Sequence, residues 1–141
     1  MLLTLLDTLR HRARHKSWAP DQASSRRGED LAHRFLRGRG YVIVARNYRL
    51  AAGDAEADLI AWDQDELVIV EVKTRASAEH GPPERAISPE KQQALSRIAR
   101  EYCSKINIPP ESVRCDLVTV LLTTPPGIEL FQQAVRLTGI A

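Results

Sequence analysis

The sequence predicts an α/β protein with a mixed central β-sheet of about five strands flanked by helices. Two segments with helical periodicity are each followed by short runs rich in β-branched residues, in the order helix, three strands, helix, two strands. The 141 residues suit one hydrophobic core, and 43% apolar with 27% charged residues is an ordinary globular composition. We therefore expect one domain at 24–141 behind an N-terminal basic extension at 1–23.

The extension has a leucine-rich start followed by cations that end at Lys16. A short helix here would dock on the domain, lie on a membrane surface or form a basic arm, and a frayed extension is the interpretation that we favour. The polar segment 21–27 is expected to be a linker. No apolar run reaches the ~18 residues of a membrane span, and cations that follow the leucines are in the wrong order for a secretory signal.

Cysteine usage fits the cytoplasmic location that we expect, and it fits other compartments nearly as well. Cys103 and Cys115 belong to no CxxC pair and to no Cys/His run with the spacing of zinc ligands. Both are expected to be reduced, buried thiols, which fits a reducing compartment.

The first helix is expected to begin at Ser24 or Ser25 as N-cap, and its apolar residues recur at spacings of three and four until Gly38. Three strands should follow, at 41–49, 57–62 and 67–73, with a loop at 51–55 and a tight polar turn at 63–66. The third strand is apolar on both faces, which indicates a central strand covered on both sides.

The second half begins with a loop at 75–87, which lacks periodicity. Ser88, Pro89 and Glu90 then form a helix start with an N-cap, a fixed first φ and an acidic first turn. That helix runs toward Pro109, and strands follow at 114–122 and 128–135. The last strand is expected at the edge of the sheet.

Charged residues end the apolar third strand, where Glu71 and Lys73 follow Val70. Residues two apart on a strand share a face, so these two side chains project together. Asp58 lies across the hairpin, near Glu71. Two adjacent carboxylates repel unless a divalent cation neutralises them, and magnesium (Mg2+), or manganese (Mn2+) in its place, suits oxygen ligands. Asp58 and Glu71 are thus candidate metal ligands, and Lys73 would orient water or stabilise charge at a phosphodiester.

The alternative is a strand end that merely reaches solvent, where Glu71 and Lys73 would form a surface ion pair worth about 0–1 kcal/mol. The tripeptide E-x-K is common, so spacing by itself weighs the two interpretations evenly. The position of Asp58 favours the functional one.

An ordered set of motifs resembles the YraN-type family of small bacterial proteins, predicted endonucleases of the PD-(D/E)XK superfamily that are similar to archaeal Holliday-junction resolvases. The resemblance covers about 28–135. The motifs are GEDLAHRFLRGRGY at 28–41, ARNYR at 45–49, EADLIA at 56–61, VEVKTR at 70–75 and RCDLV at 114–118.

The resemblance implies a restriction-endonuclease-like core, with Asp58 and Glu71 as metal ligands, Lys73 as catalytic lysine and Glu29 as an additional acid near the metal. It also implies DNA as substrate, branched or otherwise structured DNA included, and by analogy a homodimer. For Glu29 the alternative is an acid in the first turn that stabilises the helix dipole. The chain departs from the family at residues 55–58, where the usual Gly-Glu-Ile-Asp is Ala-Glu-Ala-Asp, and at Cys115, where an aromatic residue is usual.

Charge is unevenly distributed along the chain. Residues 1–49 hold eleven Lys and Arg against four Asp and Glu, whereas the remainder is net acidic. A basic flank suits a polyanion, and Arg49, Arg75 and Lys91 are candidate phosphate contacts, with solvated surface residues as the alternative. The leading hypothesis is a metal-dependent DNA nuclease, and the alternative is a nucleic-acid-binding or scaffolding protein of the same fold without efficient hydrolysis.

Overall fold

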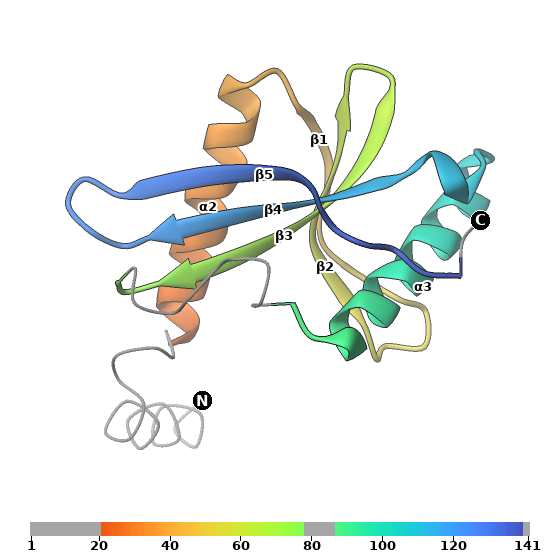
Figure 1. Cartoon of the computed structure of the whole chain (residues 1–141), viewed down its shortest axis with the longest axis horizontal. Helices are drawn as coiled ribbons and strands as arrows, with labels where there is room; N and C mark the ends of the chain where they lie inside the picture. Colours follow the sequence, from red (N-terminus) through yellow and green to blue (C-terminus); the bar gives the residue numbers. More distant parts are fainter. Residues whose placement is uncertain (1–20, 78–86, 140–141) are drawn as a thin grey trace.

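A computed structural model, which describes residues 21–77 and 87–139, contains a five-stranded sheet in the order β1-β2-β3-β4-β5 (Figure 1). Strands β3 and β4 are parallel, and the other neighbouring pairs are antiparallel. The mixed sheet predicted from the sequence is confirmed. The strands are β1 Val42–Arg49, β2 Glu56–Asp63, β3 Glu66–Arg75, β4 Arg114–Leu121 and β5 Gly127–Val135.

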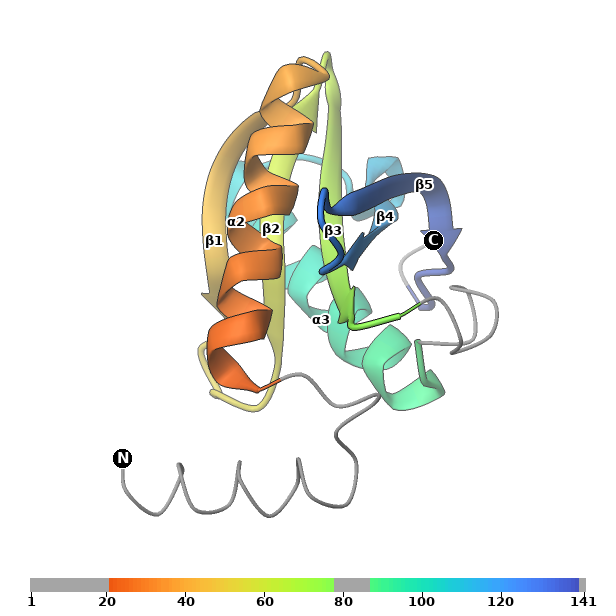
Figure 2. The ribbon, with the colours of Figure 1, turned by 90° about the vertical axis from the view of Figure 1, so that its left-hand side faces the viewer.

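Two helices cover opposite faces of the sheet, α2 (Gln22–Gly38) on one and α3 (Pro89–Ile106) on the other (Figures 1 and 2). Helix α3 lies between β3 and β4 in the chain, and such a crossover is what a parallel pair requires. A short 3-10 turn, η2 (Pro110–Ser112), leads into β4. This arrangement is the α/β fold that the sequence predicted, and it is consistent with a restriction-endonuclease-like core.

Several sequence predictions concern residues outside the described ones. Most of the N-terminal extension, for which a short helix was considered, and most of the loop expected at 75–87 lie there. Within the described ranges, neither helix is long and apolar enough to cross a membrane.

The start of α2 differs from the prediction. Asp21 is the N-cap, and its carboxylate accepts a hydrogen bond from Ser24 N at 2.8 Å. The segment predicted as a linker is therefore the first turns of the helix, so the domain boundary placed between 23 and 24 falls within α2. Apolar periodicity begins only at Leu31, so these polar turns carried no periodic signal.

Helix α3 begins as predicted. Ser88 is the N-cap, its hydroxyl accepts from Lys91 N at 3.1 Å, and Pro89 takes the first helical position. The helix ends at Asn107, whose φ of 67° is left-handed.

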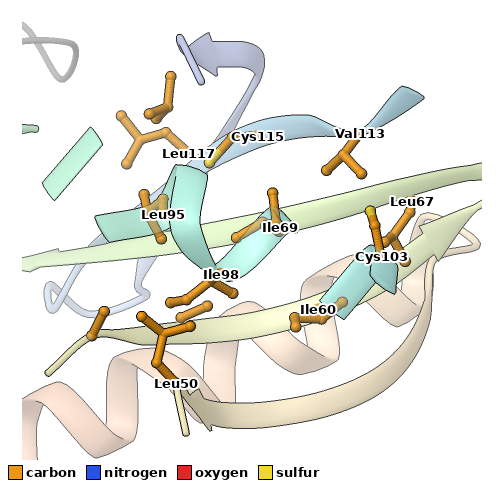
Figure 3. Packing of buried hydrophobic residues seen from close by; sticks show 14 residues of the cluster. Leu50, Ile60, Leu67, Ile69, Leu95, Ile98, Cys103, Val113, Cys115 and Leu117 are labelled. Atoms are coloured by element: carbon orange, nitrogen blue, oxygen red, sulfur yellow. The ribbon is translucent and has the colours of Figure 1, made fainter. Parts of the chain in front are cut away.

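The core forms two layers, one on each side of β3. Leu67 and Ile69 point to the α3 side, where they belong to one apolar cluster with Leu95, Ile98 and Cys103 of α3 (Figure 3). The alternate residues of β3 pack with Ala32 and Leu36 of α2. Both layers include fully buried residues, so β3 is the covered central strand that its apolar run indicated, and β5 is an edge strand as expected. Cys103 and Cys115 are free and buried, also as expected.

A glycine sets the distance between α2 and β3. A Cβ built on Gly28 would overlap Thr74 Oγ1, and Thr74 is itself buried. The backbone of α2 therefore approaches β3 as closely as the absence of a side chain allows. This contact lies one residue before Glu29 on the helix and one residue after Lys73 on the strand. It therefore sets the distance between the backbones that carry these two residues.

We expect Gly28→Ala to destabilise the protein by roughly 1–3 kcal/mol, because the buried layer has no space for the added methyl group. Gly38→Ala is the matched control, since a Cβ there meets nothing within 4 Å. Urea unfolding of both variants measures the difference. Replacing Thr74 by Ala in the Gly28→Ala background should recover part of the loss, and equal stability of the two glycine variants would contradict the steric explanation.

Candidate functional site

Strands β2 and β3 separate at the candidate site. Their last backbone pair is Leu59 with Val70. One residue further, the carboxylate of Asp58 takes over the role of a backbone acceptor, and its Oδ2 accepts from Val72 N at 2.8 Å. The register thus brings Asp58 level with Glu71, as the hairpin argument predicted.

Glu71 is a buried acid on the central strand, with 4% of its surface exposed. Its side chain lies between two lysines: Lys73 Nζ is 3.9 Å from Oε2, and Lys91 Nζ, from α3, is 3.6 Å from Oε1. The structure therefore brings Asp58, Glu71 and Lys73 together. The alternative of a solvent-exposed pair at a strand end is wrong, because Glu71 does not reach solvent.

Burial dominates the electrostatics of the carboxylates. Desolvation, followed by the negative charge of Asp58, raises the pKa of Glu71 to about 8 against the opposing effect of Lys91 and Lys73. Desolvation also raises the pKa of Asp58, although the hydrogen bond from Val72 N opposes this shift. Without a cation, the pair therefore retains a proton at neutral pH.

The residues present fit a divalent cation. Glu71 Oε1 is buried and has no hydrogen-bond partner among the described residues. A buried carboxylate oxygen is rarely left without one, and a metal would satisfy it. In the ranges 21–77 and 87–139, no three His, Cys, Asp or Glu side chains gather as ligands. The protein would thus contribute two metal ligands, Asp58 and Glu71. This number suits magnesium, which commonly binds through one or two carboxylates and keeps several waters.

Glu29 reaches the site from α2. Its Oε1 accepts from Asn47 Nδ2 at 3.3 Å and lies 3.8 Å from Arg46 Nη2. Burial, followed by the negative charge of Asp58, raises the pKa of Glu29. Because α2 begins at Gln22, Glu29 is not in the first turn, and the helix-dipole alternative is wrong.

The three candidate phosphate contacts lie in different settings. Lys91 is part of the carboxylate cluster and also donates to Glu56 O at 2.9 Å. Arg49 pairs with Glu56 at 3.2 Å, and Arg75 donates to the carbonyl of Thr74. Lys91 and Arg49 both line a depression of about 500 Å³ beside the site, so the structure brings these two to one surface.

A second polar cluster, at the opposite end of β3, was not foreseen. Asp116 is fully buried and accepts from Tyr41 Oη, Arg114 and Gln133 N. Arg114 also pairs with Asp63 and Glu66. The sequence predicted a structural role for Asp116, and these contacts agree with it. Asp63 and Glu66 come from other strands, so the spacing of Arg114 and Asp116 along β4 could not reveal the network.

Comparison with known proteins identifies relatives. The family model described as "Uncharacterised protein family UPF0102" matches residues 28–120. A UPF0102 protein of Solibacter usitatus is 49% identical over 107 residues, which cover 76% of this chain and 81% of that protein. One from Koribacter versatilis is 42% identical over 120 residues, covering 82% and 81%. One from Geotalea uraniireducens is 36% identical over 126 residues, covering 88% and 98%.

The raised pKa of Glu71 predicts a pH-dependent loss of stability in metal-free protein. Since the folded pKa of about 8 lies above the unfolded value, the folded state binds the proton more tightly. The stabilisation from this proton is complete below pH ~4.5 and is lost as pH rises through 8. Glu71→Gln removes the effect, so it should become more stable than wild type by on the order of 2–4 kcal/mol at pH 9, with each pKa unit equivalent to about 1.4 kcal/mol.

Urea unfolding with a chelator at pH 5, 7 and 9 measures this difference. Asp65→Asn, in the exposed turn between β2 and β3, is the matched control and should follow wild type at every pH. A constant difference between Glu71→Gln and wild type across the range would show that Glu71 is ionised in the metal-free protein.

Proposed function

This chain belongs to the UPF0102 family, and we propose that it is a metal-dependent nuclease that hydrolyses phosphodiester bonds of DNA. Membership of the PD-(D/E)XK superfamily, with magnesium or manganese as cofactor, is part of this proposal. The relatives establish the family, so the activity has to be argued from the site itself.

One observation carries the proposal: the buried Glu71 Oε1 lies 3.6 Å from Lys91 Nζ but accepts no hydrogen bond among the described residues, and Glu71 lies beside Asp58 where two strands separate. A buried acid in this state lowers the stability of the fold, and it contributes nothing to the packing of the core in return. A cation-binding role accounts for both the pair and its position. Asp58 and Glu71 would hold the metal, which when bound supplies an activated water and neutralises charge on the phosphate.

The lysines complete the chemistry. Lys73 Nζ lies next to Glu71 and is partly exposed, so it can donate to a water or to a phosphate oxygen outside the carboxylates. Lys91 stands on the other side of Glu71 with its ammonium already fixed by the carbonyl of Glu56. Both ammonium groups flank Glu71, so a phosphodiester bound next to the two carboxylates would lie near positive charge.

Cations for a nucleic-acid backbone lie next to the site, together with acids. Arg49 and Lys91 line the depression with Asp54, Glu56 and Glu90, and Arg75 lies at the end of β3. Such cations contact phosphates without reading sequence. A preference for branched or structured DNA and assembly as a homodimer stay predictions from the resemblance.

A second candidate function is nucleic-acid binding without efficient hydrolysis. The outward face of α2 favours it, because Arg26, Arg27, Arg34 and Arg37 are all exposed there. Arginines along one helix face can follow a phosphate backbone at a distance from the carboxylates.

We expect purified protein with magnesium or manganese to cut at least one DNA form among duplex, single-stranded and four-way-junction substrates. Asp58→Asn and Lys73→Ala should each lower the rate by at least about 100-fold, because each removes a group that acts on the reacting phosphate. Gel assays of end-labelled substrate measure cleavage, and circular dichroism checks folding. Asp65→Asn is the control of equal charge change and should cut as wild type; equal activity in Asp58→Asn would refute the assignment.

The two candidate functions differ in their response to metal. A scaffold should bind DNA with the same affinity in chelator and in magnesium, with binding unchanged in Glu71→Gln and weakened in Arg34→Gln/Arg37→Gln. Fluorescence anisotropy across a salt series measures this, and the double variant should lower the salt slope by about 2, since each lost phosphate contact contributes about 0.9. Cleavage by wild type that Glu71→Gln abolishes decides for the nuclease.

A further inference from the structure

Asn47 adopts an unusual backbone conformation in the middle of a strand. Its φ of 51° lies in the left-handed region, which non-glycine residues enter rarely and asparagine more readily than most. It stands within β1 between two regular cross-strand pairs, Arg46 with Leu59 and Tyr48 with Ala57. The register therefore places Asn47 level with Asp58 on the neighbouring strand.

The kink changes which face each side chain takes. In a regular strand, consecutive side chains point to opposite faces. Here Arg46 and Asn47 both contact α2: Arg46 Nη2 is 2.9 Å from Asp30 Oδ1, and Asn47 Nδ2 is 3.3 Å from Glu29 Oε1. Tyr48 turns to the other face, where it packs edge-on against Tyr102 of α3. The left-handed residue thus gives the α2 face two consecutive polar side chains instead of one.

Glu29 needs such a contact to stay directed at the site. The stronger partner of Arg46 is Asp30, and Glu29 lies 3.8 Å from Arg46 Nη2, beyond hydrogen-bond distance. Among the described residues, the amide of Asn47 donates the hydrogen bond that the Glu29 carboxylate accepts. Asn47 lies level with Asp58 and contacts Glu29, so the register places the two acids on the same part of the sheet, where their charges would repel. The negative charge of Asp58, after burial, accordingly raises the pKa of Glu29.

We propose that Asn47 is a positioning residue of the nuclease site, whose left-handed backbone and side-chain amide hold Glu29 beside Asp58. The inference rests on the proposed function. Asparagine meets both requirements, because it tolerates the left-handed region and carries a donor that a glycine lacks. A conformation that costs of order 1 kcal/mol persists where the surrounding structure uses it, and here it aims a carboxylate.

The test separates the backbone conformation from the amide. Asn47→Gly keeps the kink, and with it the packing of Tyr48, but removes the donor. Gln133→Gly is the matched control, because Gln133 of β5 has a φ of 54° and lies at the other end of the sheet, next to Asp116. Both variants should fold with wild-type stability or better. Only Asn47→Gly should weaken manganese binding, measured by calorimetry, and slow cleavage, each by about 10–100-fold as for other groups that orient a site.

A double-mutant cycle then asks whether Asn47 acts through Glu29. Glu29→Gln alone should lower manganese affinity, and adding Asn47→Gly should lower it by less than about twofold more, because the amide no longer has a charged acid to position. Asn47→Asp keeps the shape and the tolerance of positive φ but replaces the donor by a second carboxylate. It should lose as much as Asn47→Gly.

The outcomes distinguish the inference from its premise. If wild type neither binds manganese nor cuts DNA, the proposed function fails. If wild type does both while Asn47→Gly stays within twofold of Gln133→Gly, the positioning role is wrong and the kink serves only the packing of Tyr48. Losses from Glu29→Gln and Asn47→Gly that multiply would likewise overturn it, since independent effects exclude action through Glu29.

Discussion

The burial of a carboxylate on the central strand is the constraint on which the rest of the site depends. Glu71 occupies a position that an apolar residue would fill in an ordinary core, and its neighbours in both directions are valines. An ionised acid in this place requires compensation, and two lysines provide part of it. Asp58 adds a second negative group to the same space, so the arrangement favours a bound proton or a bound cation.

Comparison of two buried acids within the chain shows how a structural site differs from a candidate functional one. Asp116 has hydrogen bonds to both oxygens, and its partner Arg114 is held by two further acids. That network satisfies its charges internally and ties together the start of β4, the β2–β3 turn and β5. Glu71 instead keeps one oxygen without a hydrogen bond in the part of the chain that the structure describes. The fold thus satisfies the hydrogen-bonding capacity of Asp116, whereas it leaves one oxygen of Glu71 available to a ligand.

Close packing and local strain both serve the position of Glu29. Gly28 allows α2 to meet β3 without an intervening side chain, and the kink at Asn47 turns an amide toward the helix. The first contact joins Gly28 to β3, and the second joins its neighbour Glu29 to β1. They make the first helix part of the site, although its chain lies far from Glu71 in the sequence.

The sequence by itself determined the elements and the core of the candidate site. Periodicity located both helices and the five strands, the two-faced apolar run identified β3 as central, and the spacing within β3 paired Glu71 with Lys73, because these signals are local. The family resemblance drawn from the motifs is confirmed by the UPF0102 match. The prediction of a linker at the polar start of α2 was wrong, since an N-cap followed by polar turns has no apolar period.

Only the tertiary structure decided that Lys91 joins Glu71, that Arg114 joins three strands, and that Asn47 meets Glu29. These contacts depend on the separation of β2 and β3, on the twist of the sheet and on one left-handed residue, and distances between segments remote in sequence are set by packing rather than by pattern.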